Sequence, residues 1–174
     1  MQSRIEKAKK IKVLVLDVDG VLTDGTLFFD NKGKEYKGFN VQDGLGIKLM
    51  QKAGIQIAVI SGRSSKPVEL RMAMLGVKLV YLGKLEKGIA LEEILHKTGC
   101  NADEVAHVGD DLIDLPVFTR VGFAVAVRNA NEQILPYVDW QTELSGGQGA
   151  VREVCDFILQ SQGKLEALVE SFKT

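Results

Sequence analysis

IKVLVLDVDGVLTDG, residues 11–25, joins an apolar run to a pair of closely spaced aspartates. Its first part, IKVLVL, is apolar except for one lysine and rich in β-branched residues, which is typical of a buried strand. Asp17 and Asp19 follow directly, and alternation puts both side chains on the same side if the strand continues. Two carboxylates placed so close repel each other and lose hydration, so we expect a functional partner that offsets this cost.

Apolar β-type runs alternate with helical patterns along the rest of the chain. The expected strands are 11–17, 55–60, 78–82, 105–109 and 122–127, and the expected helices lie near 44–53, 65–75, 86–98, 111–120 and 150–162. Asp43 and either Ser64 or Ser65 are candidate helix N-caps. The alternation predicts the α/β class, with a doubly wound, Rossmann-type parallel sheet covered by helices on both faces.

The segment TLFFDNKGKEYKGF, residues 26–39, breaks this alternation. It contains two short β-type runs around a turn at 31–34, so it predicts a small β-hairpin inserted after the first strand. The hairpin carries more large apolar side chains than one small face can bury, which indicates an interface; the alternative is a hairpin folded onto its own domain. No linker or repeat divides the chain, and we expect a single domain, residues 1–174.

Composition and charge limit the classes of function. The chain has 174 residues, of which 45% are hydrophobic and 26% charged, as is ordinary for a globular protein. A net charge of -1 without a block of like charges does not indicate nonspecific binding to nucleic acid or membranes. The charged start has no signal-peptide pattern, no apolar run approaches the roughly 18 residues of a membrane span, and two cysteines make no disulfide framework. We therefore expect a cytoplasmic protein.

Polar residues follow each of the first four predicted strands. Ligands of open parallel sheets bind outside the carboxyl ends of the strands. The residues found there are Asp17, Asp19, Ser61, Arg63, Lys84, Lys87, Asp110, Asp111 and Asp114. Each group taken alone has a structural explanation as a turn, a helix N-cap or a solvated charge. Because all of them fall at the same end of successive strands, we expect them to meet at one edge of the sheet.

Carboxylates, a hydroxyl and lysines at one place favour phosphoryl transfer with a divalent cation. Carboxylate oxygens suit Mg²⁺, which relieves repulsion among the acids and neutralises charge on the transferring group. One carboxylate can attack phosphorus to give an aspartyl-phosphate, and a second can protonate the leaving alkoxide and then activate water. The hydroxyl, backbone N–H groups and a lysine can hold the phosphoryl oxygens.

DVDGVLT, residues 17–23, resembles the DxDGxxT motif of the haloacid dehalogenase-like (HAD-like) phosphatases. Ser61, Lys87 and GDDLID, residues 109–114, match the other motifs of that superfamily in its chain order. The resemblance implies that Asp17 is the nucleophile and Asp19 the general acid and base. It further implies that Ser61 and Lys87 bind the phosphoryl group.

The same resemblance implies how the cation is held. Mg²⁺ would be bound by Asp17, the backbone carbonyl of Asp19 and Asp110. Asp111 or Asp114 would act through water or in orientation.

Over nearly its whole length the chain is similar to the 3-deoxy-D-manno-octulosonate 8-phosphate phosphatase family. The segments that carry this resemblance are DVDGVLTDG, FNVQDGLGI, SGRSSKPVELRMAMLGV, VGDDLIDLPV and GGQGAVREVCDFIL. It implies hydrolysis of this sugar-acid phosphate to Kdo and phosphate in lipopolysaccharide biosynthesis. It also implies no large cap domain, a homotetramer with sites at subunit boundaries, and a C-terminal tail, residues 163–174, able to reach a neighbouring site.

The resemblance also implies a set of substrate-contacting positions. They are Asp19, Asn40, Val41, Gln42, Asp43, Gly44, Lys48, Arg63, Arg71 and Lys87. Gln42 and Lys48 depart from the family pattern, which commonly has arginine at both places, and lysine loses the bidentate fork of arginine. These departures concern the substrate contacts and not the reaction.

Four alternatives remain open from the sequence. A phosphatase for 2-keto-3-deoxynononate 9-phosphate is the nearest, although those similar enzymes carry Glu at the position of Arg63 and Lys at that of Met74, and this difference implies the eight-carbon substrate. The phosphatase-like half of a CMP-sialate synthetase is another, but this chain has no nucleotidyltransferase half. A signalling receiver domain would carry its phospho-acceptor on the third strand, where KLVYL ends without Asp. An inactive homologue acting as a binding module is disfavoured because all motif carboxylates are present.

Overall fold

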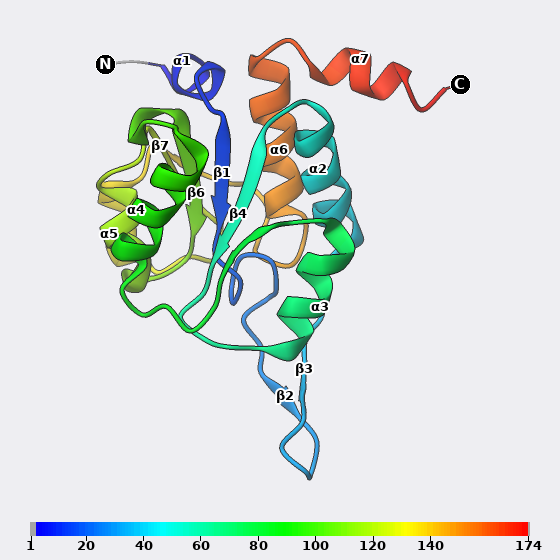
Figure 1. Ribbon diagram of the computed structural model, residues 1–174, viewed down its shortest axis with the longest axis vertical. Coiled ribbons are helices and arrows are strands. Elements are labelled where there is room, and N and C mark those ends of the chain that lie inside the picture. The colour runs from blue at the N-terminus through cyan, green and yellow to red at the C-terminus, as the bar shows by residue number, and fades with distance from the viewer. Residues whose placement is uncertain (1–2, 174) are drawn as a thin grey trace.

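The computed structural model describes residues 3–173, which form a parallel sheet between two layers of helices (Figure 1). The sheet has six strands in the order β5-β4-β1-β6-β7-β8, and every neighbouring pair is parallel. The strands are β1 Val13–Leu16, β4 Gln56–Ile60, β5 Leu79–Tyr81, β6 Val105–Gly109, β7 Phe123–Ala126 and β8 Trp140–Gln141. The predicted strands and the doubly wound parallel sheet are therefore confirmed, and β8 is an additional edge strand too short to show a pattern.

Helices cover both faces of this sheet. They are α1 Arg4–Lys9, α2 Val41–Lys52, α3 Lys66–Leu75, α4 Lys87–Thr98, α5 Leu115–Phe118, α6 Ala150–Ser161 and α7 Leu165–Glu170, with 3₁₀ turns at Ala102–Glu104, Leu112–Asp114 and Glu132–Tyr137. Within residues 3–173, no helix has both the length and the apolar character needed to cross a membrane.

Alternation along β1 divides the core into two layers. Leu14 and Leu16 pack with residues of α2, α3 and α6, whereas Val13 and Val15 pack with residues of α4. All four side chains are fully buried. Burial of each such side chain contributes roughly 1.5–3 kcal/mol, so β1 is anchored on both faces at the point where its polar end begins.

Two predicted helix boundaries are wrong. Helix α2 begins at Val41, because the side chain of Asn40 accepts a hydrogen bond from the N–H of Gln42 and caps the helix. Asp43, the predicted N-cap, lies inside this helix instead. The helix predicted at 111–120 is a 3₁₀ turn followed by the short helix α5, since Asp111 and Asp114 form a capping box around that turn.

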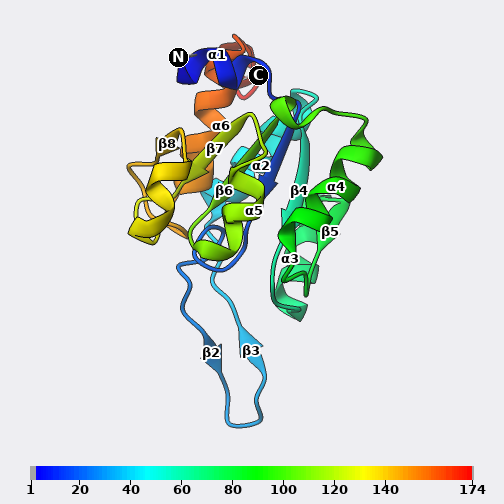
Figure 2. The ribbon, with the colours of Figure 1, turned by 90° about the vertical axis from the view of Figure 1, so that its left-hand side faces the viewer.

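The predicted hairpin is present, with β2 Phe28–Phe29 paired antiparallel to β3 Glu35–Tyr36. The side chain of Asp30 accepts hydrogen bonds from the N–H groups of Lys32 and Lys34, which closes the turn. The hairpin projects away from the sheet and its helices, and residues 3–173 contain no large cap domain (Figure 2).

The predicted C-terminal tail is largely helical in the described residues. Leu168 of α7 is buried in the core, and the Lys164 ammonium group donates to the carbonyl of Ala53. Helix α7 lies at the end of the molecule opposite the hairpin (Figure 1). The described part of the tail is thus folded against its own chain; Thr174 lies outside the described residues.

Candidate active site

Loops at the carboxyl ends of β1, β4 and β6 surround a cavity of about 290 Å³. Six of the predicted site residues line it: Asp17, Asp19, Ser61, Arg63, Asp110 and Asp111. The apolar side chains of Leu85 and Ile113 also line the cavity. The expected convergence at one edge of the sheet is therefore observed.

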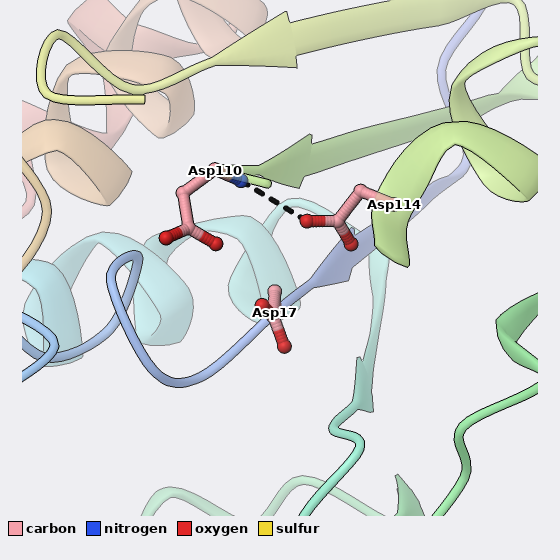
Figure 3. Close-up of side chains that lie close together, drawn as sticks. All are labelled: Asp17, Asp110 and Asp114. Carbon is pink, nitrogen blue, oxygen red and sulfur yellow. Dashed lines mark hydrogen bonds between the residues drawn. The ribbon is translucent and has the colours of Figure 1, made fainter. Parts of the chain in front are cut away.

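Three carboxylates form the floor of this site. Asp17, Asp110 and Asp114 each offer an oxygen atom, and these atoms lie within 4.8 Å of one another (Figure 3). Gly20 permits this approach, because its φ is +88° and a Cβ there would lie 2.0 Å from Oδ2 of Asp110. A side chain at residue 20 would therefore displace Asp110 from the cluster.

Lys87, the first residue of α4, is buried beneath the cavity. Its Nζ lies 2.9 Å from Oδ1 of Asp17 and 2.7 Å from Oδ1 of Asp114. Burial alone would lower the pKa of Lys87, but the two carboxylates outweigh burial and raise the pKa. Lys87 therefore stays protonated and offsets part of the negative charge of the cluster.

The pKa values of the Asp17 and Asp110 carboxyl groups are both raised. Burial, reinforced by repulsion from Asp114, raises the pKa of Asp17 to about 6. Burial, together with repulsion from Asp17 and Asp114, raises the pKa of Asp110 to about 8. Carboxylate oxygens held this close together, with too little positive charge nearby to balance them, suit a divalent cation such as Mg²⁺.

Asp114 connects the cluster to the core rather than offering a vacant ligand. Its Oδ1 accepts from Lys87 and lies 2.9 Å from Nε2 of His107, while its Oδ2 accepts from the N–H of Asp110 at 3.0 Å (Figure 3). Burial would raise the pKa of Asp114, but the His107 and Lys87 contacts lower it. Asp17 and Asp110 are thus the carboxylates best placed to bind a cation, with Asp114 orienting Asp110.

Replacement of Asp114 should strongly destabilise the protein. The Asp114→Ala change leaves the buried Lys87 with one carboxylate partner and His107 Nε2 with none among the described residues. Breaking a buried ion pair in this way typically costs about 3–5 kcal/mol. Urea unfolding should show this loss in the free energy of unfolding, against less than about 1 kcal/mol for Glu69→Ala, which breaks an exposed pair with Lys66. Equal stabilities for the two variants would contradict the central place given to Asp114.

Ser61 and Asp19 lie on the loops that follow the neighbouring strands β4 and β1. Ser61 directly follows β4, is buried, and its Oγ accepts from the N–H of Arg63 at 3.2 Å. The Asp19 carboxylate forms an ion pair with Lys37 of the hairpin, and Nη1 of Arg63 lies 3.9 Å from its other oxygen. A hydroxyl and an acid are therefore both available beside Asp17.

Several predicted substrate contacts do not line this cavity. They are Asn40, Val41, Gln42, Asp43, Gly44, Lys48 and Arg71, all on or next to α2 and α3. The Asp43 carboxylate is buried and accepts from the N–H of Arg152 at 2.8 Å, so it caps α6. Arg71 lies against Gly44 and the ring of Phe39. Within one chain, then, these residues lie outside the cavity, and a substrate contact by Asp43 is not supported, because its carboxylate is buried against α6.

Three site residues lack any motif that could identify them from sequence. His107 reads as an ordinary residue of a buried strand, yet it contacts Asp114 and the carbonyl of Val15. Glu35 and Lys37 read as polar residues of an exposed hairpin, yet they contact Arg63 and Asp19. Only the three-dimensional path of the hairpin brings Glu35 and Lys37 to the site.

Comparison with known proteins identifies the family. A family model described as haloacid dehalogenase-like hydrolase matches residues 79–154. The 3-deoxy-D-manno-octulosonate 8-phosphate phosphatase KdsC of Escherichia coli is 49% identical over 162 residues, which cover 93% of this chain and 86% of that protein.

Solved structures agree with this result. The crystal structure of the 3-deoxy-D-manno-octulosonate 8-phosphate phosphatase from Moraxella catarrhalis, in complex with magnesium ion, phosphate ion and KDO, has a TM-score of 0.95 at 41% identity and covers 97% of each chain. The corresponding Yersinia pestis structure has a TM-score of 0.92 at 46% identity, covering 93% of this chain and 88% of that one. The chain therefore belongs to the haloacid dehalogenase-like hydrolases and, within them, to the 3-deoxy-D-manno-octulosonate 8-phosphate phosphatase family.

Proposed function

We propose that this protein hydrolyses 3-deoxy-D-manno-octulosonate 8-phosphate to Kdo and inorganic phosphate, with Mg²⁺ as its cofactor and an aspartyl-phosphate as intermediate. The observation that carries the proposal is the cluster of Asp17, Asp110 and Asp114 around Lys87, in a chain 49% identical to a named phosphatase of this substrate. The reaction supplies Kdo, which places the enzyme in lipopolysaccharide biosynthesis as the family resemblance implies.

The side chains divide the reaction between them. A carboxylate oxygen of Asp17 attacks phosphorus and forms a new P–O bond, while the bond to the sugar oxygen breaks and Asp19 gives that oxygen its proton. Asp19 then takes a proton from water, which attacks the aspartyl-phosphate, releases phosphate and restores Asp17. Ser61 and Lys87 hold the phosphoryl oxygens during both steps.

Asp17, the backbone carbonyl of Asp19 and Asp110 would hold the Mg²⁺ ion. When bound, Mg²⁺ neutralises charge on these carboxylates and on the transferring phosphoryl group. The raised pKa of Asp110, caused first by burial and then by its acidic neighbours, reflects the charge that a cation would compensate.

Arg63 is the substrate contact that the structure supports best in this chain. It lines the cavity, and its side chain is 42% exposed beside Asp19. A guanidinium group suits the bidentate recognition of the Kdo carboxylate. The predicted contacts on α2 and α3 that are accessible, including Lys48 and Arg71, would reach substrate at a subunit boundary, whereas the buried Asp43 carboxylate would not.

Phosphate release across a panel of substrates tests the proposed function. Kdo 8-phosphate should be turned over with the highest kcat/KM, ahead of 2-keto-3-deoxynononate 9-phosphate and simple hexose phosphates. A preference for the nine-carbon substrate would support the alternative phosphatase instead. Absence of turnover with every phosphate ester in the presence of Mg²⁺ would contradict the assignment as a phosphatase.

We also propose a homotetramer built around the hairpin. Leu27, Phe28, Phe29 and Tyr36 are each about half exposed in the single chain, which is more exposed apolar surface than a hairpin normally presents. A cytoplasmic location is proposed as well. The two cysteines are unpaired in the structure, which suits a reducing compartment.

Replacement of the hairpin aromatics should dissociate the assembly. The Phe28→Ser/Phe29→Ser double variant removes apolar surface that is 53% and 54% exposed in the single chain. Sedimentation at micromolar concentration should give about four chains per particle for the wild type and fewer for this variant. Ile5→Ser, at a residue 50% exposed on α1, serves as the control and should leave the assembly unchanged. A wild-type chain that sediments as a monomer would overturn the tetramer.

A further inference from the structure

Four charged side chains of alternating sign form a closed ring at the mouth of the site. Lys37 pairs with Oδ1 of Asp19, and its Nζ lies 3.4 Å from Oε1 of Glu35. The same Glu35 oxygen accepts from Nη2 of Arg63 at 2.9 Å, and Nη1 of Arg63 lies 3.9 Å from Oδ2 of Asp19. Asp19 and Arg63 come from the loops after β1 and β4, whereas Glu35 and Lys37 come from the hairpin.

The side chains of this ring differ in how deeply they are buried. The side chain of Lys37 is only 1% exposed and that of Glu35 13%, whereas Arg63 is 42% exposed. The other Glu35 oxygen accepts from Oγ of Ser65 at 2.5 Å, which ties the hairpin to the N-terminus of α3. A buried ion pair holds its geometry tightly because separation would leave an unpaired charge. Lys37 and Glu35 therefore form the more buried half of the ring, where breaking an ion pair costs most.

Lys37 makes a contact with Asp19 that no other side chain makes. Across residues 3–173, it is the one side chain within hydrogen-bond distance of the Asp19 carboxylate. It contacts Oδ1 and so leaves Oδ2 available for proton transfer. Asp19 lies in a turn after β1, where a lone carboxylate would otherwise sample several rotamers.

We propose that Lys37 is a positioning residue for the reaction, which fixes the Asp19 carboxylate for proton transfer, and that Glu35 braces both Lys37 and Arg63. The proposal rests on the acid–base role of Asp19 given under the proposed function. The proton that moves belongs to Asp19, passes to the leaving oxygen as the P–O bond breaks, and is later recovered from water. The hairpin thereby contributes to catalysis as well as to assembly.

The leaving-group dependence of kcat/KM distinguishes positioning from a merely structural role. Phenyl phosphate and 4-nitrophenyl phosphate have nearly the same size and lack the sugar, but phenolate is a much stronger base and needs the proton more. Because kcat/KM covers the steps up to aspartyl-phosphate formation, poor positioning of Asp19 should affect phenyl phosphate most. The ratio of the two kcat/KM values is independent of the fraction of enzyme that is folded.

Lys37→Met should lower kcat/KM for phenyl phosphate about tenfold more than for 4-nitrophenyl phosphate, a part of the roughly 10²–10⁴-fold that acid–base groups contribute. Lys37→Arg should restore most of the ratio, and Glu35→Gln should shift it in the same direction by less. Lys32→Met, at an exposed lysine in the hairpin turn, is the matched control and should leave it unchanged.

Asp19→Asn, measured in parallel, separates failure of the proposal from failure of the proposed function. If Asp19→Asn shows the leaving-group bias and Lys37→Met does not, the role of Lys37 is overturned while the acid–base assignment stands. If neither variant shows the bias, the acid–base role of Asp19 itself is overturned. If Lys37→Met does not accumulate as folded protein, an unchanged ratio in Glu35→Gln overturns the bracing arrangement.

Discussion

The Asp17→Asn variant should lose turnover of Kdo 8-phosphate by about 10⁴-fold or more while it keeps the fold, since removal of a nucleophile typically has effects of this size. An amide oxygen has neither the charge nor the basicity to attack phosphorus, so no covalent intermediate forms. The amide has the same shape as the carboxylate, and Lys87 keeps its 2.7 Å contact with Asp114. The backbone N–H of Asp17 also keeps its hydrogen bond to the carbonyl of Val108.

Asp24→Asn is the matched control for this change. Asp24 lies in the same loop, is exposed, and accepts a hydrogen bond from the N–H of Thr26. Its replacement should leave kcat within about twofold of the wild type, as expected for a surface change. Near-normal turnover in Asp17→Asn, with circular dichroism showing both variants folded, would contradict covalent catalysis by Asp17.

Removal of the metal should abolish activity, and Mg²⁺ should restore it. Asp17 and Asp110 are held close together, with burial and mutual repulsion raising the pKa of Asp110 to about 8. Phosphoryl transfer at such a site lacks charge neutralisation without a cation. Dialysis against EDTA followed by titration with MgCl₂ measures both the loss and the recovery of phosphate release.

The Asp110→Asn variant tests whether the need for Mg²⁺ arises at the carboxylates of the active site. The variant loses one anionic oxygen ligand and should need at least about tenfold more Mg²⁺ for half-maximal activity. Asp156→Asn, at the surface pair with Arg152, should need the same concentration as the wild type. Activity that survives full chelation, or an equal Mg²⁺ requirement in both variants, would contradict the cation site proposed here.

The sequence predicts the sheet and the acidic floor of the site because both depend on local pattern. The apolar run before Asp17 predicts β1, and the run before Asp110 predicts β6; parallel pairing then brings the two strand ends together. No longer-range information is needed to place these carboxylates near one another. The same reasoning places Ser61 at the end of β4.

Residues whose partners are distant in sequence could not be predicted in this way. Lys37 reaches Asp19 only because it follows β3 at the base of the projecting hairpin, where the chain returns to the loop after β1; nothing in EYKGF marks that contact. His107 has the position of a core residue, and its contact with Asp114 depends on the turn after β6. Asp43 has the residue type of an N-cap, but it caps α6, 109 residues away, rather than its own helix. At Asp43 the residue type therefore predicts a capping role correctly, but it does not predict which helix is capped.

Acid quench of the enzyme within one turnover tests whether Asp17 carries the phosphoryl group during the reaction. After rapid mixing with Kdo 8-phosphate and Mg²⁺, the quenched protein is digested and its peptides are examined by mass spectrometry. We expect the added mass of one phosphoryl group on the peptide that contains DVDGVLTDG, located at Asp17 and absent from Asp17→Asn. Turnover with no phosphorylated peptide at any quench time, or with the phosphoryl group on another residue, would contradict this role of Asp17.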